Sequence, residues 1–234
     1  MVPPDTFVPI AERSGLIDTI GRWVLHEACT TVAAWHAATP TEPPLSIAVN
    51  VSGRQLASEE LVAQVTEVLQ CSGLAPSSLI LEMTETSLVQ DALGTTRVLQ
   101  ALRALGIRLA IDDFGTGYSS LSYLRQFPID ILKIDRTFVE TITTNDHVPP
   151  IMRGLLDLGR TLNLEIIAEG VELDVQRDRL RRERCDLAQG YLFAHPMSAD
   201  EAERLSHVSA ALGPVEAPAG RDTATGQDLA GPVP

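Results

Sequence analysis

The sequence predicts an α/β fold, a TIM-like (β/α)8 barrel in which parallel strands alternate with helices. Short apolar segments of strand length alternate along the chain with longer segments of helical periodicity. At least five of the short segments end in a polar or acidic residue followed by a turn, which is how such a barrel builds its active site at one rim. An open doubly wound sheet is the alternative, but it would draw its site residues from only one or two loops.

Six strands are predicted, and each is a short apolar segment bounded by turn residues. They lie near residues 45–50, 78–83, 107–112, 130–134, 164–168 and 187–191. A closed barrel of this kind has eight strands. The first two strands are therefore expected to be missing from the front, where the chain opens on a helix. Either the start is truncated or a partner completes the fold, because uncovered strand edges are a liability.

The segments that flank these strands have helical periodicity. In the first of them, Ile20, Trp23, Val24 and Ala28 recur at three- and four-residue steps, and Gly106 ends the third in the usual C-terminal manner. Helices are predicted near residues 11–38, 53–69, 98–105, 119–127, 148–162 and 199–211.

The chain is predicted to contain one large domain and a tail. The domain, incomplete at its N-terminus, is expected to span residues 1–212, within the usual size of an α/β barrel. Residues 213–234 are rich in Gly, Ala, Pro, Thr and Asp, so they are predicted to be disordered.

Composition and charge narrow the function classes. Hydrophobic residues make up 44% and charged residues 21% of the 234 residues, ordinary values for a globular protein. No apolar run approaches the roughly 18 residues of a membrane span, and no signal-peptide pattern opens the chain, so a cytoplasmic protein without a membrane segment is expected. The net charge of −13 argues against nonspecific binding of DNA or RNA, which needs basic side chains. The isolated cysteines, Cys29, Cys71 and Cys185, predict neither a disulfide framework nor a thiolate zinc site.

The functional argument depends on the segment Arg108 to Gly117, which reads RLAIDDFGTG. A short apolar run is followed by two adjacent carboxylates, Asp112 and Asp113. Gly115 and Gly117 then permit a backbone turn that aims both acids into one site. Two neighbouring carboxylates repel each other, and a divalent metal ion removes that repulsion. A solvated Asp-Asp turn is the plain alternative for the pair taken alone.

Hard oxygen donors stand at successive strand ends. They are Asn50, Glu82, Asp112, Asp113 and Glu169. Such a set suits Mg2+, Mn2+ or Ca2+, whereas any one of these residues alone would more often be a cap or a solvated turn residue. Two metal ions about 3.5–4 Å apart can generate hydroxide near neutral pH and hold both oxygens of an in-line displacement. Metal-assisted phosphoester hydrolysis is therefore the leading hypothesis.

Two further residues complete the predicted site. Alternation along IDILKID puts Lys133 and Asp135 on one face of a strand. Lys133 either orients a water or phosphate oxygen or forms only a charge-balancing salt bridge. Glu85 is better placed to hold the 112–117 loop by accepting backbone N–H bonds than to bind metal. A two-carboxylate glycosidase is the enzymatic rival, but it needs neither the adjacent acids nor the lysine.

With these residues assembled, the chain closely resembles the EAL-domain family, bacterial phosphodiesterases that linearise cyclic di-GMP. The matching strings are FVPIAERSGLI, IGRWVLHEAC, NVSGRQL, LEMTET, DDFGTGYSSLSYL, IDILKID, IIAEGVE and QGYLFAHPM. They span roughly residues 3–200, and the combination of DDFGTG, LKID and AEGVE is highly specific. The resemblance implies a TIM-like barrel of the EAL type.

The resemblance also implies a set of metal ligands. Asn50, Glu82 and Asp112 match the family's first-metal ligands. Asp113 matches the ligand to the second metal, and Asp135 matches another metal-site acid. The implied cofactors are Mg2+ or Mn2+ in a two-metal site, with Ca2+ as a candidate inhibitor.

Catalytic and substrate-binding roles follow in the same way. Lys133 matches the lysine that contacts the catalytic water, and Glu169 the glutamate credited with metal binding or general-base work. Glu85 matches the residue that steadies the DDFGTG loop. Gln189 matches a residue near the substrate, and its neighbour Gly190 is grouped with it.

One departure from the family is serious. The Glu-Ala-Leu motif, whose glutamate is a metal ligand, and a substrate-binding arginine should precede FVPIAE, and neither is present. The expected function is hydrolysis of cyclic di-GMP to linear pGpG in bacterial signalling. The alternative is a catalytically impaired domain that acts as a cyclic di-GMP receptor or protein-interaction module. A homodimer and an upstream GGDEF or sensory domain are expected by resemblance only.

Overall fold

The computed structural model describes residues 2–89, 92–117, 124, 126–143 and 148–212. The chain forms two compact units, Met1–Met197 and Ser198–Pro234. In the second unit, helix α11 (Ala199–Leu212) begins with reciprocal hydrogen bonds between Ser198 and Glu201. The predicted tail, residues 213–234, and most of the predicted helix at 119–127 lie outside the described residues.

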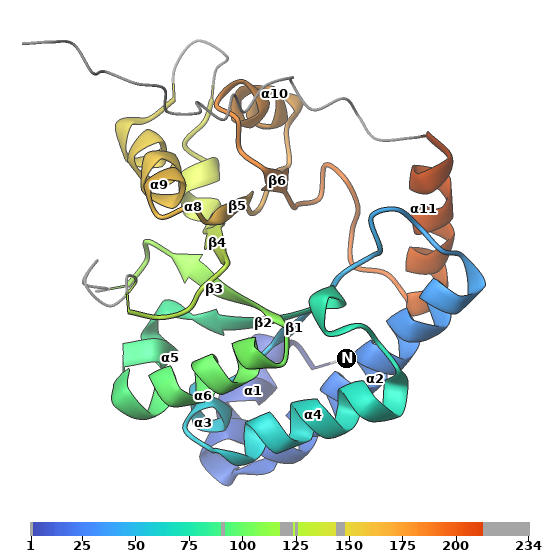
Figure 1. The fold of residues 1–234 in the computed structure, drawn as a ribbon. Coiled ribbons are helices and arrows are strands. Elements are labelled where there is room, and N and C mark those ends of the chain that lie inside the picture. Colours follow the sequence, from blue (N-terminus) through green and yellow to red (C-terminus); the bar gives the residue numbers. More distant parts are fainter. Residues whose placement is uncertain (1, 90–91, 118–123, 125, 144–147, 213–234) are drawn as a thin grey trace, which may run out of the picture. The chain divides into compact units, whose positions relative to one another are not determined.

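The first unit is built on a sheet of six parallel strands that follow one another in sequence order (Figure 1). They are β1 (Ile47–Asn50), β2 (Leu79–Thr84), β3 (Arg108–Phe114), β4 (Ile131–Ile134), β5 (Glu165–Ala168) and β6 (Leu187–Ala188). Together they form a half-barrel, which confirms the predicted TIM-like α/β fold. Within the described sheet, β1 and β6 are the edge strands.

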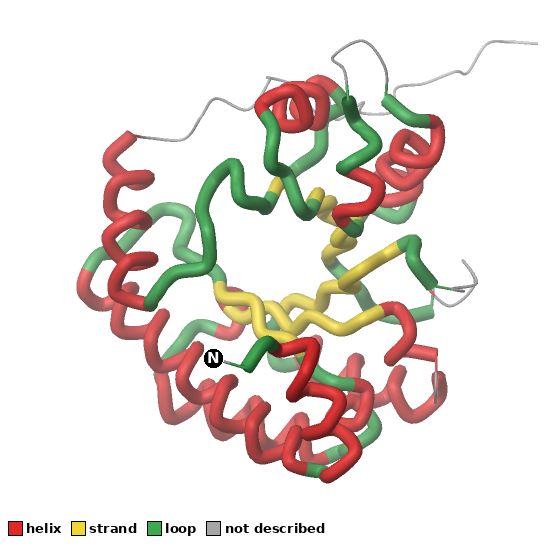
Figure 2. The backbone as a smooth tube through the Cα atoms, turned by 180° about the vertical axis from the view of Figure 1, so that it is seen from behind, coloured by secondary structure: helices red, strands yellow, loops and turns green. Residues whose placement is uncertain are grey.

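Helices of the first unit lie on the outer side of the arc that the strands follow (Figure 2). They are α1 (Pro4–Ser14), α2 (Leu16–Ala38), α3 (Gly53–Leu56), α4 (Glu60–Ser72), α5 (Glu85–Val89), α6 (Ala92–Ala104), α8 (Arg136–Val139), α9 (Pro150–Thr161) and α10 (Asp174–Arg182), with a 3-10 turn, η1, at Pro76–Ser78. The longest of them, α2, contacts both α4 and β1. The six predicted strands are therefore observed in order, whereas α10 between β5 and β6 was not predicted and the helix expected over residues 53–69 is divided into α3 and α4.

The N-terminal helix differs from the prediction. A single helix was expected over residues 11–38, but Gly15 separates α1 from α2 with a φ of 78°. Glycine adopts this left-handed conformation without steric cost, so it ends α1 and begins α2 at one residue. The apolar periodicity continues across the break, which is why periodicity alone did not reveal it.

Two separate apolar clusters follow from the alternation of side chains along each strand. The outward-facing residues, such as Leu81, Ile111 and Leu132, join the main core under the helices. The inward-facing residues Ile80, Ala110 and Ile131, with the partly buried Ile167, form a second, smaller cluster. This inner cluster is the middle layer of the half-barrel, and the residues two positions further along the strands form the layer above it.

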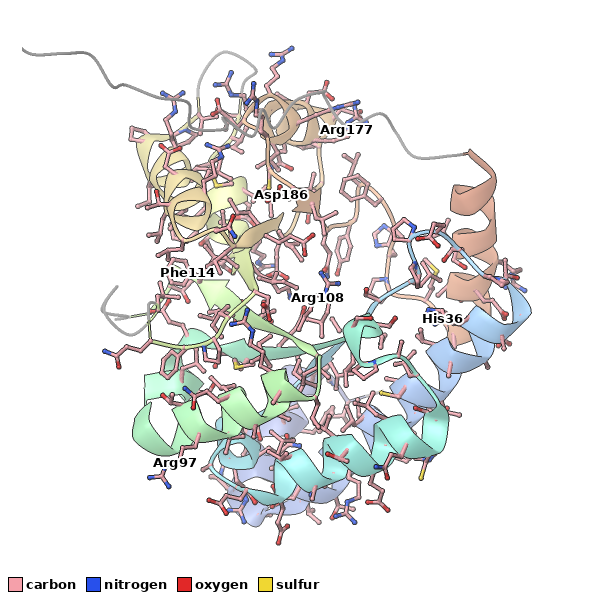
Figure 3. All side chains as sticks on the ribbon, in the orientation of Figure 1. His36, Arg97, Arg108, Phe114, Arg177 and Asp186 are labelled. Atoms are coloured by element: carbon pink, nitrogen blue, oxygen red, sulfur yellow. The ribbon has the colours of Figure 1, made fainter. Side chains whose placement is uncertain are left out.

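The layer below the inner cluster is polar. Arg108 begins β3, and its guanidinium bonds Glu165 Oε2 on β5 at 2.9 Å and Ser46 Oγ before β1 at 3.0 Å. Figure 3 labels Arg108 on the inner side of the sheet. This side chain joins β3 to β5 across the intervening β4, at the end of the strands opposite the acidic rim.

Helix α9 packs closely on β5 through a glycine. A Cβ atom at Gly159 would lie 2.7 Å from Cγ1 of Ile166, a fully buried side chain, whereas a Cβ at Gly154 in the same helix would meet nothing within 4 Å. The two glycines therefore differ in their packing, although both are interior residues of one helix.

We expect Gly154→Ala and Gly159→Ala to change stability in opposite directions. Replacing an open helical glycine by alanine raises the free energy of unfolding by about 0.5–1 kcal/mol. At Gly159 the same gain is outweighed by overpacking, which typically costs about 1–3 kcal/mol. Urea unfolding of the two variants tests this, and equal shifts in both would contradict the proposed contact between α9 and β5.

Candidate functional site

The centre of the candidate site is the Lys133 side chain on the inner face of β4. Its Nζ lies 2.8 Å from Glu82 Oε2, 2.9 Å from Asp112 Oδ1 and 2.7 Å from Glu169 Oε1. These carboxylates come from β2, β3 and the residue after β5, so four neighbouring strands meet at one ammonium group. Lys133 is only 3% exposed. A buried charge of this kind is tolerated because all three of its N–H donors have anionic acceptors.

The lysine keeps its charge in these surroundings. Burial lowers the pKa of Lys133, but the charge of Glu82 and the hydrogen bonds that the ammonium donates to Glu169 and Glu82 oppose this shift, and the net effect raises the pKa. Lys133 is therefore an ammonium group at physiological pH and serves as a hydrogen-bond donor, not as a base.

The carboxylates are less easily kept ionised. Burial raises the pKa of Glu82 and raises the pKa of Glu169 to about 7, although Lys133 opposes both shifts. The pKa of Asp113 is also raised, first by burial and then by the charges of Asp112 and Asp135. One ammonium group thus compensates only part of the negative charge among the described side chains of this rim, and a further cation would relieve the excess.

The backbone of β3 brings the two adjacent aspartates into one site. In a regular strand, Asp112 and Asp113 would point to opposite faces. The register with β4 shifts between Ile111 and Phe114, and Asp113 itself has a φ of 53°. Aspartate tolerates this left-handed conformation better than most residues. We expected Gly115 and Gly117 to supply the turn, and Gly115 does have a φ of 99°, but the left-handed backbone begins two residues earlier, at Asp113.

Three of the acids are close enough to share a metal ion. Carboxylate oxygens of Asp112, Asp113 and Glu169 all lie within 4.8 Å of one another. Asp113 is exposed and the other two are partly buried, so an ion can approach the cluster from solvent. Their oxygens are ligands that hard divalent cations prefer, and the donor set therefore fits such an ion.

Glu85 connects the end of β2 to the loop after β3. It is buried at the first position of α5, and its Oε2 accepts the backbone N–H of Gly115 at 3.1 Å. A Cβ atom at Gly117 would lie 2.7 Å from Glu85 Oε1, so the loop passes close to this carboxylate. The geometry agrees with a residue that holds the loop.

The remaining predicted residues lie along the same rim. Asn50 is exposed at the end of β1, in register with Glu82. Asp135 follows β4 and caps α8 by accepting from the backbone and hydroxyl of Thr137. Gln189 and Gly190 follow β6. Within the described residues, these four side chains or backbone positions form no hydrogen bond or ion pair with the Lys133 cluster.

Two features of this site were not predicted from the sequence. Lys133 was predicted, but the sharing of its ammonium group by three carboxylates was not, because that pairing depends on the strand order. The bond between Arg108 and Glu165 beneath the site was not predicted either. Each lies four residues before a predicted acid, Asp112 or Glu169, on the same face of its strand, and that spacing was the available signal.

Comparison with known proteins decides the family. The model of the EAL domain matches residues 1–196. The chain belongs to the EAL domain family. No helix within the described part of this EAL domain or of the segment after it is long and apolar enough to cross a membrane.

Several known proteins and one solved structure are similar to this EAL domain. An uncharacterised signalling protein of Caulobacter vibrioides is 48% identical over 86% of the chain, and the bifunctional diguanylate cyclase/cyclic di-GMP phosphodiesterase MucR of Pseudomonas aeruginosa is 43% identical over 86%. The solved PaMucR phosphodiesterase in complex with c-di-GMP superposes with a TM-score of 0.80, covering 86% of this chain and 81% of that one. The chain spans only 24% and 29% of the full length of the two curated relatives.

We expect Lys133→Met to destabilise the metal-free protein strongly. The change keeps most of the side-chain volume but leaves three carboxylates without their ammonium partner, and breaking a buried ion pair in this way costs about 3–5 kcal/mol. The measurement is urea unfolding in EDTA. Arg54→Met is the matched control, because the Arg54–Asp18 pair is 54% and 44% exposed and such pairs contribute about 0–1 kcal/mol. Equal stability of both variants would show that Lys133 is not the electrostatic centre.

Proposed function

We propose that this chain is a metal-dependent phosphodiesterase that hydrolyses cyclic di-GMP to linear pGpG. The observation that carries the proposal is the single ammonium of Lys133 surrounded by Glu82, Asp112 and Glu169, with Asp113 beside them. The names of relatives support the substrate, since MucR and NbdA of Pseudomonas aeruginosa are both named cyclic di-GMP phosphodiesterases.

Six side chains are the proposed ligands of two Mg2+ or Mn2+ ions. They are Asn50, Glu82, Asp112, Asp113, Asp135 and Glu169. When bound, such ions lower the pKa of water toward neutrality and offset the charge that develops on a phosphoryl group. The excess of carboxylate at this rim supports the proposal, because a dinucleotide carrying two negative phosphates is repelled from these acids unless cations accompany it.

Lys133 and Glu169 have complementary proposed roles. Lys133 remains protonated, and it is proposed to exchange one of its three carboxylate contacts for the attacking water or a phosphate oxygen, which it then holds in place. Glu169 is proposed to bind a metal ion or to accept a proton from that water, and the positive charge of a bound ion would lower the pKa that burial raises in the metal-free site. The contact of 2.7 Å between the two side chains keeps donor and acceptor together.

The other predicted residues are proposed to hold the site or the substrate in place. Glu85 holds the loop after β3 through the Gly115 N–H and thereby keeps Asp112 and Asp113 in place. Gln189 and Gly190 are proposed to contact the substrate from the end of β6. Ca2+ is proposed to bind the same acids and inhibit. A homodimer, an upstream GGDEF or sensory domain and a cytoplasmic location are proposed as well.

A second candidate function is a receptor that binds cyclic di-GMP without cleaving it. The observation that favours it is the position of Asn50 on β1, an edge strand of the described sheet, so the rim of candidate ligands ends there. A site with fewer ligands would hold the dinucleotide through the remaining acids and cations but turn it over slowly. Calorimetry with Ca2+ present, compared with turnover in Mg2+, separates the receptor from the enzyme.

We expect the 234-residue chain to convert cyclic di-GMP to pGpG with Mg2+ or Mn2+, and EDTA to abolish the reaction reversibly. Asp112→Ala removes a ligand and a partner of Lys133, so its rate should fall by at least about 100-fold. Separation of the nucleotides by chromatography measures both rates, with Arg54→Met as the control that should match the wild type. Equal rates for Asp112→Ala and the wild type would refute the assigned site.

A further inference from the structure

Gln176 is a buried polar side chain outside the set of candidate ligands. It is the third residue of α10 and is only 4% exposed. Its Oε1 accepts the backbone N–H groups of Glu172 and Leu173 at 2.9 and 3.0 Å. Its Nε2 donates to the carbonyl of Val139, the last residue of α8, at 3.4 Å. This one amide group therefore joins the loop after β5 to the end of α8.

Helix capping explains only one of these three bonds. A glutamine at the third position of a helix commonly accepts the N–H of the residue before the helix, as Gln176 does with Leu173. Glu172 lies one residue earlier, and Val139 belongs to another helix. A buried amide without partners is unfavourable, so the three bonds together keep this side chain in one place.

Each of the two joined segments carries a proposed metal ligand. Glu169 begins the loop after β5, and Asp135 immediately precedes α8. The N–H of Glu169 donates to the carbonyl of the last residue of β4 at 3.0 Å, so both acids leave adjacent strands at the same level. A Cβ atom at Gly170 would lie 2.3 Å from the Cβ of Arg136, so the loop passes directly against the start of α8. These contacts fix the near ends of the loop and the helix, and Gln176 fixes their far ends.

We infer that Gln176 is a positioning residue that sets the spacing between Asp135 and Glu169 and thereby strengthens the binding of divalent ions; the inference rests on the proposed function. Its three bonds complete a ring of contacts that runs from Asp135 through α8 and the amide to the loop and Glu169. Without the amide, each segment is held mainly at the end that carries its acid. Residues that orient metal ligands without touching the ion typically contribute about 10- to 100-fold in affinity.

The competing explanation is that Gln176 only stabilises the fold. A purely structural residue would affect the melting temperature and leave the affinity for ions unchanged. Gln176→Met keeps most of the side-chain volume and removes all three hydrogen bonds. Val65→Ala is the control, because it removes packing from a fully buried position of α4, a helix that contacts α2 and α6.

The first measurement is the dissociation constant for Mn2+ of the full chain without substrate, from electron paramagnetic resonance of the free ion. It should rise about 10- to 100-fold in Gln176→Met, because the two acids lose their fixed spacing. It should stay at the wild-type value in Val65→Ala, although both variants melt at a lower temperature than the wild type. Equal weakening in the two variants would show general destabilisation and refute the inference.

The second measurement needs no variant. Because coupling between two sites is reciprocal, Mg2+ bound by the acids should slow hydrogen exchange of the Glu172 and Leu173 amides, which Gln176 bonds. The control is the Leu109 amide, which bonds Asp130 at 3.0 Å at the opposite end of the strands and should exchange at the same rate with and without Mg2+. Nuclear magnetic resonance resolves these amides individually.

The outcomes distinguish the two proposals. If the wild type binds Mn2+ and a folded Gln176→Met binds it equally tightly, the inference is refuted and the proposed function stands. If Gln176→Met does not fold, hydrogen exchange decides, and Glu172 and Leu173 amides that ignore Mg2+ refute the inference. If the wild type binds no Mn2+, or Asp112→Ala binds it as tightly as the wild type, the proposed function and the inference fail together.

Discussion

A buried ammonium surrounded by carboxylates is the interaction on which this structure depends. Lys133 bonds acids from three other strand ends, and none of these groups would be tolerated in the interior without the others. The folded structure therefore needs these ion pairs, whatever reaction the site performs. The same contacts place four strands of the half-barrel in a fixed order around one point, and any ligand of the acids must share them with the lysine.

The interior of the half-barrel is organised in layers, and the strand period explains why. Residues two positions apart share a face, so Ile80 lies below Glu82 and Ala110 below Asp112. The small apolar layer separates the acidic rim from the polar layer that contains Arg108. Glu82 and Asp112 therefore lie on strands directly above a packed apolar layer. This rigid support keeps mutually repelling carboxylates close together.

Much of this arrangement could be predicted from the sequence. The strand ends, the acids that follow them and the inward position of Lys133 all depend on local periodicity, which the sequence records directly. The break at Gly15 could not be read from periodicity, because the apolar pattern continues through it. The left-handed Asp113 and the three-way sharing of Lys133 depend on register and on neighbours that are distant in the chain.

The bond between Arg108 and Glu165 has a consequence for the opposite end of the strands. It holds β3 and β5 together at their starts, roughly 13 Å of strand below Asp112 and Glu169. The same two strands are joined again at the rim, where Lys133 bonds both Asp112 and Glu169. Arg108 and Glu165 are both 35% exposed, so dissolved salt weakens their attraction. Ionic strength therefore acts mainly on the lower of the two connections between β3 and β5, because the Lys133 contacts at the upper one are largely buried.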